Sequence, residues 1–326
     1  MIYNESMLDI IGLGSIFVDY FFETEADHLK KVGLGIEEDC LWEDKFKENQ
    51  KLFLKGLELK TKSLGGMTVN TLMILSKMGL KCGSLGIIGN DTDGNFVKEK
   101  IKGVNIDEVI EGGNTAKCFC LITNKGQERT FVVYENKEED MVFNKINMDY
   151  INNSKFVHLS PFFTKDMKLT FEKVKKLVEK IEGPKITFTP SATYVGYGLD
   201  KLKPILKKTE VFFSNKWEME SLNKSKDFVY ESKKLLEYGP KIVICTLGSE
   251  GVLVTTADKQ FQQAAIKPKK IVDSTGAGDT FAGGFLYGLV KGKTVEEAAQ
   301  IGTKLASMSL SEYGEGWLDS LVNDFD

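Results

Sequence analysis

Residues 271–285 read IVDSTGAGDTFAGGF: a short apolar strand, a Gly-Ala-Gly turn, and an acid at the start of an apolar helix. The main-chain amides of Gly276, Ala277 and Gly278 are expected to point outward at the helix start. A helix N-terminus carries roughly half a positive charge and suits phosphate oxygens. Asp279 can there accept the proton of a hydroxyl that attacks a phosphate. The segment therefore predicts phosphoryl transfer to an alcohol.

Two earlier segments carry groups suited to binding the alcohol. Asp19 lies among aromatic residues in an extended run, and a buried acid needs a partner or a ligand. In LGGMTVN, residues 64–70, Gly65 and Gly66 allow close approach to the backbone, and Asn70 offers both a donor and an acceptor to hydroxyls. The alternatives are that Asp19 pairs with a lysine and that Asn70 caps a helix.

Two further groups of residues come directly after predicted buried strands. Asn215 and Glu218 follow the strand at 211–214, while Thr246 and Gly248 follow the strand at 242–245. Open parallel sheets bind ligands at the carboxyl ends of their strands, so these residues are candidates for a second ligand. The alternative for Asn215 and Glu218 is a helix N-terminus with favourable charge.

The segments DSTGAGDTF and LGGMTVN resemble the two signatures of the ribokinase-type (PfkB) carbohydrate and nucleoside kinase family, and the resemblance extends over about residues 8–314. It implies that Asp279 is the catalytic base and that the amides of the preceding turn stabilise the transferred group. It also implies a set of acceptor-binding residues, namely Asp19, Gly65, Gly66 and Asn70.

The same resemblance implies that the protein uses ATP and Mg²⁺, and also K⁺ if it follows those relatives that bind a monovalent cation. Asn215, Thr246 and Gly248 match the elements of the family that bind the nucleotide. Glu218 matches the glutamate that places hydrated magnesium, a task suited to a carboxylate. Asp273 and Thr275 stand where relatives often bind a monovalent cation.

The activity implied is transfer of the γ-phosphate of ATP to a primary hydroxyl of a small sugar. A nucleoside acceptor, as in the adenosine-kinase branch, stays open. A non-catalytic sugar-binding protein on the same fold is disfavoured because Asp279 and its glycine turn are both present. Thr189 replaces an acid that many sugar-kinase relatives carry, which weakens any assignment to a ketohexose.

Two other nucleotide-binding classes do not fit the pattern. The glycines at 12 and 14 begin a dinucleotide-binding pattern, but Phe17 occupies the place of its third glycine. The segment at 288–294 is one residue short of a P-loop and follows a helix where a P-loop would precede one.

The order of elements predicts an α/β fold. From residue 155 onward apolar strands alternate with helices, which favours a mostly parallel central sheet with helices on both faces. The two-faced runs at 16–24 and 115–134, the second with a hairpin turn at 125–127, suit a small β-sheet lid. We therefore expect one ribokinase-like catalytic domain over 1–326, with the lid formed by insertions at about 15–62 and 112–136.

Composition narrows the partners to small molecules. The net charge of −4 offers no basic field for nucleic acid, and no apolar run approaches 18 residues, so no membrane contact is expected. Five scattered cysteines and the lack of a signal peptide favour free thiols in the cytoplasm. Because Arg129 is the only arginine, amides, lysines and a metal must hold the phosphates. In the family that the chain resembles, exposed lid strands often pair with each other, which favours a homodimer through the lid.

Overall fold

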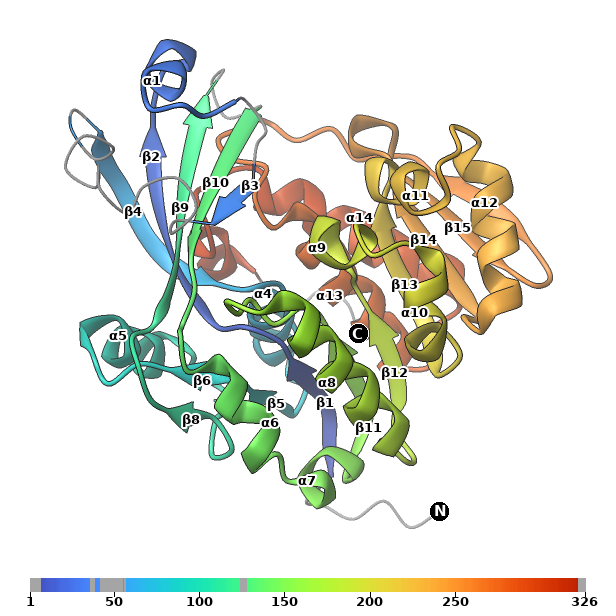
Figure 1. Ribbon diagram of the computed structural model, residues 1–326. Coiled ribbons are helices and arrows are strands. Elements are labelled where there is room, and N and C mark those ends of the chain that lie inside the picture. The colour runs from blue at the N-terminus through green and yellow to red at the C-terminus, as the bar shows by residue number, and fades with distance from the viewer. Residues whose placement is uncertain (1–6, 36–38, 42–54, 56, 124–127, 322–326) are drawn as a thin grey trace.

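A nine-stranded sheet forms the centre of the computed structural model, which describes residues 7–35, 39–41, 55, 57–123 and 128–321 (Figure 1). Its strands run in the order β16-β15-β14-β13-β12-β11-β1-β5-β7, and all pair in parallel except β15 and β16. Their bounds are β1 (Leu8–Leu13), β5 (Cys82–Leu85), β7 (Val104–Asn105), β11 (Ser154–Leu159), β12 (Lys185–Phe188), β13 (Thr209–Asn215), β14 (Ile242–Thr246), β15 (Val252–Thr256) and β16 (Gln260–Gln263).

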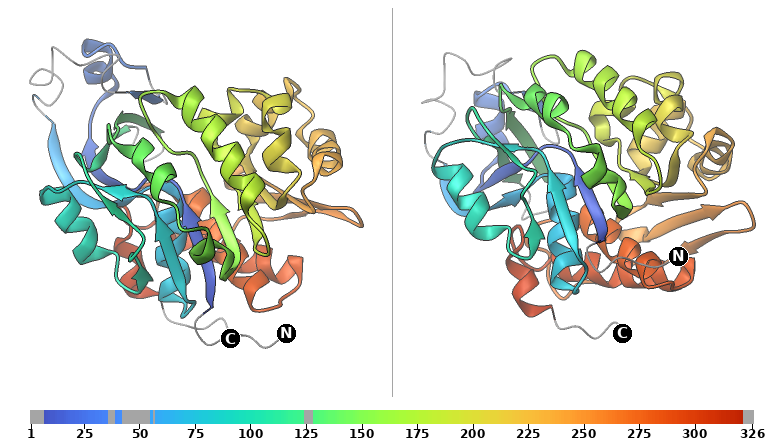
Figure 2. Two further views of the ribbon diagram at one scale, coloured as in Figure 1. Left: turned by 60° about the horizontal axis from the view of Figure 1, so that its bottom comes forward. Right: turned by 90° about the horizontal axis from the view of Figure 1, so that it is seen from below.

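Helices cover both faces of this sheet, as both views of Figure 2 show. One face packs against α4 (Met67–Lys77), α13 (Ala277–Val290) and α14 (Val295–Ser309). The other carries α6 (Val142–Lys145), α7 (Met148–Asn152), α8 (Met167–Lys180), α9 (Ser191–Val195), α10 (Leu199–Leu206), α11 (Lys216–Asn223) and α12 (Phe228–Leu235). The predicted mostly parallel sheet between two helical layers is confirmed.

Consecutive residues of the first strand show why its sequence is apolar apart from Asp9, which lies near the start of the strand and pairs with Lys155. Ile10 and Ile11 are both fully buried, but Ile10 belongs to the core under α4 and α13 while Ile11 belongs to the core under α8. Side chains alternate across a strand, so a strand covered on both faces needs apolar residues at every position.

A second, five-stranded sheet projects from one end of the molecule (Figure 1). Its order is β3-β10-β9-β2-β4, and it mixes parallel with antiparallel pairs. The strands are β2 (Phe17–Glu23), β3 (Asp39–Leu41), β4 (Glu58–Gly65), β9 (Ala116–Thr123) and β10 (Glu128–Tyr134), and α1 (Ala26–Lys31) follows β2. Two short strands, β6 (Ile87–Ile88) and β8 (Ile110–Glu111), pair separately beside α5 (Thr92–Lys100).

The small sheet is tied to α5 through one acid. Asp93 accepts a 2.7 Å hydrogen bond from the hydroxyl of Tyr20 and pairs with the ammonium groups of Lys62 and Lys117. Burial opposes ionisation of this carboxyl, but the three donors prevail and lower its pKa to about 2. The carboxylate of Asp93 therefore joins strands β2, β4 and β9 of the small sheet to α5.

Some local details of the fold are not marked by the sequence pattern. The apolar run at 84–89 is divided at Gly86, where an added Cβ would lie 2.9 Å from the Ile16 side chain. Strand β16 was not expected because its sequence, QFQQ, has no apolar run. The last long helix, α14, ends at Ser309. The expected turn at 125–127 lies outside the described residues.

Candidate active site

Asn70 and Asp279 meet between α4 and α13. The side-chain amide of Asn70 donates a 2.9 Å hydrogen bond to Oδ2 of Asp279. Thr71, one residue further along α4, donates from its hydroxyl to the main-chain carbonyl of Asp279 at 3.2 Å. Asn70 thus does not cap its helix, which was the alternative interpretation. The bonds place the predicted base and one predicted acceptor-binding residue side by side.

The turn before α13 leaves main-chain amides available. Gly276 caps the helix with φ +71°, a left-handed conformation suited to glycine, and its carbonyl accepts the first helical bond, from Thr280. Within the described residues, the amides of Gly276 and Gly278 donate to no carbonyl, and that of Ala277 reaches Ser274 only at 3.4 Å. The turn can therefore accept an anion at the helix N-terminus.

The environment of Asp279 suits a base that works near neutral pH. Burial raises the pKa of its carboxyl from 3.8 to about 7, while the Asn70 hydrogen bond and the charge of Arg129 act in the opposite direction. A general base is most effective when its pKa lies near the working pH. The carboxyl of Asp279 could therefore accept a proton near neutral pH.

Arg129 is a site residue that the sequence analysis missed. It lies on β10 of the small sheet, and its guanidinium donates a 2.8 Å hydrogen bond to the hydroxyl of Ser274, two residues before Gly276. From the sequence, the presence of a single arginine was interpreted to mean that no group of arginines holds the phosphates. Its position on a strand of the small sheet, in a chain otherwise using lysine, was the available signal.

Asp19 is packed directly on the glycine pair. A Cβ on Gly65 would lie 2.0 Å from Oδ1 of Asp19, and a Cβ on Gly66 would lie 2.4 Å from the carbonyl oxygen of Ser15. Gly66 also has φ +101°. Both glycines are thus required by close packing, whatever ligand approaches them. Asp19 does not pair with a lysine among the described residues, contrary to the alternative interpretation.

A pocket joins these groups. Asp19, Asn70, Thr275 and Gly276 line it together with Glu315 and Trp317 from the C-terminal segment. Burial raises the pKa of Asp19 well above its ordinary value, and the negative charges of Glu315, Asp273 and Asp279 add to this effect. The structure therefore brings together carboxyl groups whose ionised forms repel one another.

A model of the pfkB family carbohydrate kinases matches residues 59–317. The chain belongs to this family. An uncharacterized sugar kinase of Archaeoglobus fulgidus is 32% identical over 247 residues, which cover 74% of this chain and 96% of that protein. A cytidine kinase of Thermococcus kodakarensis is 32% identical over 167 residues, 50% of this chain and 58% of that kinase.

The fold is also that of solved kinases. The crystal structure of adenosine kinase from Sinorhizobium meliloti superposes with a TM-score of 0.81 at 20% identity, covering 95% of each chain. This PfkB-family protein is therefore a phosphotransferase with an alcohol acceptor, and it acts on a small sugar or a nucleoside. Kinases of this family use ATP, typically with Mg²⁺. No helix in the described part of the chain is long and apolar enough to span a membrane.

The kinase has its Asn-x-x-Glu element at the carboxyl end of β13. Asn215 Oδ1 accepts from the Glu218 amide at 2.8 Å, and Glu218 Oε2 accepts from the Asn215 amide at 2.9 Å. This reciprocal pair is a capping box. Asn215 and Glu218 therefore form a helix N-terminus, which was the alternative interpretation of these two residues. The capping box also fixes the Glu218 carboxylate at the carboxyl end of β13.

Thr246 and Gly248 lie at the end of the next strand, β14. The Thr246 hydroxyl is 3.4 Å from the Ser214 carbonyl, which joins the ends of β13 and β14. Gly248 is exposed with φ +59°, and an added Cβ would meet nothing within 4 Å. The backbone here is open to a ligand.

Asp273 and Thr275 present oxygens suited to a monovalent cation. Oδ1 of Asp273 accepts from the Thr275 amide at 2.9 Å. Asp273 Oδ2 and Thr275 Oγ1 are buried without a hydrogen-bond partner among the described residues. Burial raises the pKa of Asp273, opposed by the Thr275 amide. Unpaired buried oxygens of this kind fit a bound cation.

Proposed function

We propose that this protein transfers the γ-phosphate of ATP to a primary hydroxyl of a small sugar, with Asp279 as general base. The observation that carries the proposal is the Asn70–Asp279 hydrogen bond beside the open amides of the 276–278 turn. It puts a carboxylate with a pKa of about 7 next to an anion-binding helix start.

Each residue of the turn has a defined task in this reaction. The acceptor hydroxyl gives its proton to Asp279 as its oxygen bonds to the γ-phosphorus. The bond from phosphorus to the bridging oxygen breaks, and ADP leaves with that oxygen. The amides of Gly276, Ala277 and Gly278 stabilise the charge on the transferred group, and the Arg129 guanidinium reaches the same region from β10.

Acceptor binding is assigned to Asp19, Gly65, Gly66 and Asn70. A carboxylate and an amide on the pocket wall offer acceptors and a donor to vicinal hydroxyls. The sugar kinase similarity covers 74% of this chain and supports a sugar acceptor. The similarity to a cytidine kinase supports the second candidate, a nucleoside, over half of the chain.

The remaining assignments concern the nucleotide and ions. Asn215, Thr246 and Gly248 are proposed to contact ATP at the ends of β13 and β14. Magnesium neutralises phosphate charge when bound, and Glu218 would hold it through water. Asp273 and Thr275 would hold K⁺ through their buried oxygens.

We propose one catalytic domain over residues 1–326, in which the small sheet serves as a lid from insertions at about 15–62 and 112–136. Closure over the pocket would exclude water and so prevent ATP hydrolysis. Edge strands of the small sheet offer a surface for a homodimer, which gel filtration would detect.

The test is a panel of sugars and nucleosides with ATP and Mg²⁺, in which ADP release and the mass of the phosphorylated product are both measured. One sugar should be phosphorylated at its primary hydroxyl with kcat/KM at least about tenfold above every nucleoside. Preference for a nucleoside would replace the sugar assignment, and no product from any alcohol would refute the proposal. Asp279→Asn, purified in parallel, controls for contaminating kinases.

A further inference from the structure

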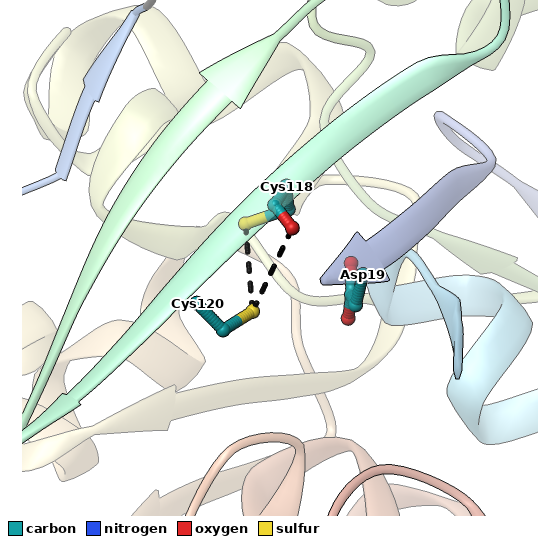
Figure 3. Close-up of side chains that lie close together, drawn as sticks. All are labelled: Asp19, Cys118 and Cys120. Carbon is teal, nitrogen blue, oxygen red and sulfur yellow. Dashed lines mark hydrogen bonds between the residues drawn. The ribbon is translucent and has the colours of Figure 1, made fainter. Parts of the chain in front are cut away.

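Three potential metal ligands lie close together beside the acceptor pocket, and one of them, Asp19, lines it. Asp19 on β2 and Cys118 on the adjacent strand β9 are partners in the parallel register of the small sheet. Cys120 is two residues further along β9 and therefore shares the face of Cys118. One ligand atom from each of the three lies within 4.8 Å of the others, and Figure 3 shows the side chains gathered at one point.

We propose that Asp19, Cys118 and Cys120 bind a thiophilic divalent cation such as Zn²⁺, and that the bound cation competes with the phosphoryl acceptor. The sequence supplied only a Cys-x-Cys pair, too few ligands for a metal site. The third ligand comes from a strand that is distant in the sequence, so the fold alone assembles the group.

The sulfur atoms already have the separation that a tetrahedral metal requires. Two thiolates at about 2.3 Å from a tetrahedral Zn²⁺ are about 3.8 Å apart. The Sγ atoms of Cys118 and Cys120 are 3.8 Å apart. A carboxylate oxygen at about 2.0 Å from the metal would need to lie about 3.5 Å from each sulfur. Because the Asp19 oxygen already lies within 4.8 Å of both sulfur atoms, each of these distances has to shorten by at most about 1.3 Å.

A disulfide between the same cysteines fits less well. Residues two apart in an extended strand have Cα atoms about 6.7 Å apart, close to the upper limit of about 6.8 Å for disulfides. The sulfur atoms would also have to approach from 3.8 Å to bonding distance. Metal binding needs no such movement of β9.

The electrostatics of the pocket favour a cation. Asp19 is buried beside the carboxyl groups of Glu315, Asp273 and Asp279, and a bound cation would relieve the repulsion among their ionised forms. Cys120 is 1% exposed, and burial raises the pKa of its thiol, so metal binding has to release that proton. Magnesium prefers oxygen ligands, so the Mg²⁺ needed for catalysis should not displace a cation held by sulfur.

Binding is tested on the ligand-free protein with metal alone. Cd²⁺ should produce the ultraviolet cadmium–thiolate charge-transfer band with one equivalent, and Zn²⁺ should abolish that band by displacement while excess Mg²⁺ should not. Cys118→Ser and Cys120→Ser should each weaken binding at least about tenfold. Cys245→Ala, in the buried strand β14, is the matched control and should bind normally. A missing band, or a full band in Cys120→Ser, would overturn the proposal.

A second measurement needs no variant. Iodoacetamide labelling of the wild-type protein, read out by peptide mass, should slow at Cys118 when Zn²⁺ is present and should not slow with Mg²⁺. Equal labelling rates with and without Zn²⁺ would count decisively against the site. This readout covers the case in which a serine variant does not fold.

Competition with the acceptor rests on the proposed role of Asp19 and is tested separately. In excess Mg²⁺, Zn²⁺ should raise the KM of the acceptor found in the panel and leave that of ATP unchanged. Loss of this effect in Cys118→Ser would support the shared site. Metal binding with an unchanged acceptor KM would overturn the competition, while a failed binding test would leave the kinase assignment intact.

Discussion

The side-chain amide of Asn70 at the start of α4 holds the carboxylate of Asp279 at the start of α13, at 2.9 Å. Both helices lie on the same face of the large sheet, and their first turns converge at the pocket. The bond orients one carboxylate oxygen of Asp279. In the proposed reaction the other oxygen accepts the substrate proton, so acceptor binding and activation of its hydroxyl would be coupled in this pair of residues.

The pH dependence of catalysis should report the carboxyl of Asp279. Its pKa of about 7 means that the base is protonated and inactive below that pH. We therefore expect kcat/KM for the acceptor to rise through about pH 7 and then level off. A profile that is flat from pH 5 to 8 would contradict the assignment.

Replacement of Asn70 should move that profile. The Asn70 hydrogen bond lowers the pKa of Asp279, so Asn70→Ala should shift the rising limb upward by about 0.5–1 pH unit. It should also reduce kcat/KM by roughly tenfold or more through lost orientation. Thr71→Ser keeps the hydroxyl that bonds the Asp279 carbonyl and is the control, with no shift expected. If the rising limb of the pH profile is unchanged in Asn70→Ala, the hydrogen bond does not lower the pKa of Asp279.

Arg129 can be tested chemically because it is the only arginine in the chain. Phenylglyoxal, which modifies guanidinium groups, should inactivate the enzyme with one label per chain, and ATP should protect it. Arg129→Gln should lower kcat by about 10²-fold, in line with the loss of one donor to a transferring phosphoryl group. Arg129→Lys keeps the positive charge and should therefore lose less kcat than Arg129→Gln. Full activity of the labelled enzyme would exclude a role in transfer.

The stability of the ligand-free protein should also depend on Asp279. The folded protein keeps this proton up to about pH 7, whereas an unfolded aspartate releases it near 3.8, so stability falls as pH rises between these values. Asp279→Asn removes that penalty. Well above pH 7 the variant should be more stable by up to about 4 kcal/mol, with no difference near pH 4, as measured by urea unfolding at both pH values. Equal stability at pH 8 would mean that the carboxyl is not desolvated.

The sequence predicted the sheet and the glycine turn before α13 because both depend on local patterns. Mostly apolar strands such as Leu8–Leu13 and the Gly276 turn are encoded within a few residues. What it could not predict are contacts between distant segments. The Asn70–Asp279 bond, the reach of Arg129 to Ser274 and the grouping of Asp19 with the cysteines all depend on how the small sheet and the helices assemble.

Some sequence patterns had two possible physical explanations, and only the packing in the structure could distinguish between them. Gly65 and Gly66 were assigned to acceptor approach, and the structure shows that Asp19 and the Ser15 carbonyl already require them. Asn215 and Glu218 form a capping box, a structural task that coexists with the proposed magnesium role.

The most direct test of the central claim is transfer of labelled γ-phosphate from ATP to the preferred acceptor by wild type and Asp279→Asn, with acceptor and ATP affinities measured on the same preparations. We expect the variant to bind both ligands within about threefold of wild type and to lose about three orders of magnitude or more in kcat. Transfer within tenfold of the wild-type rate would contradict the role of Asp279 as the base.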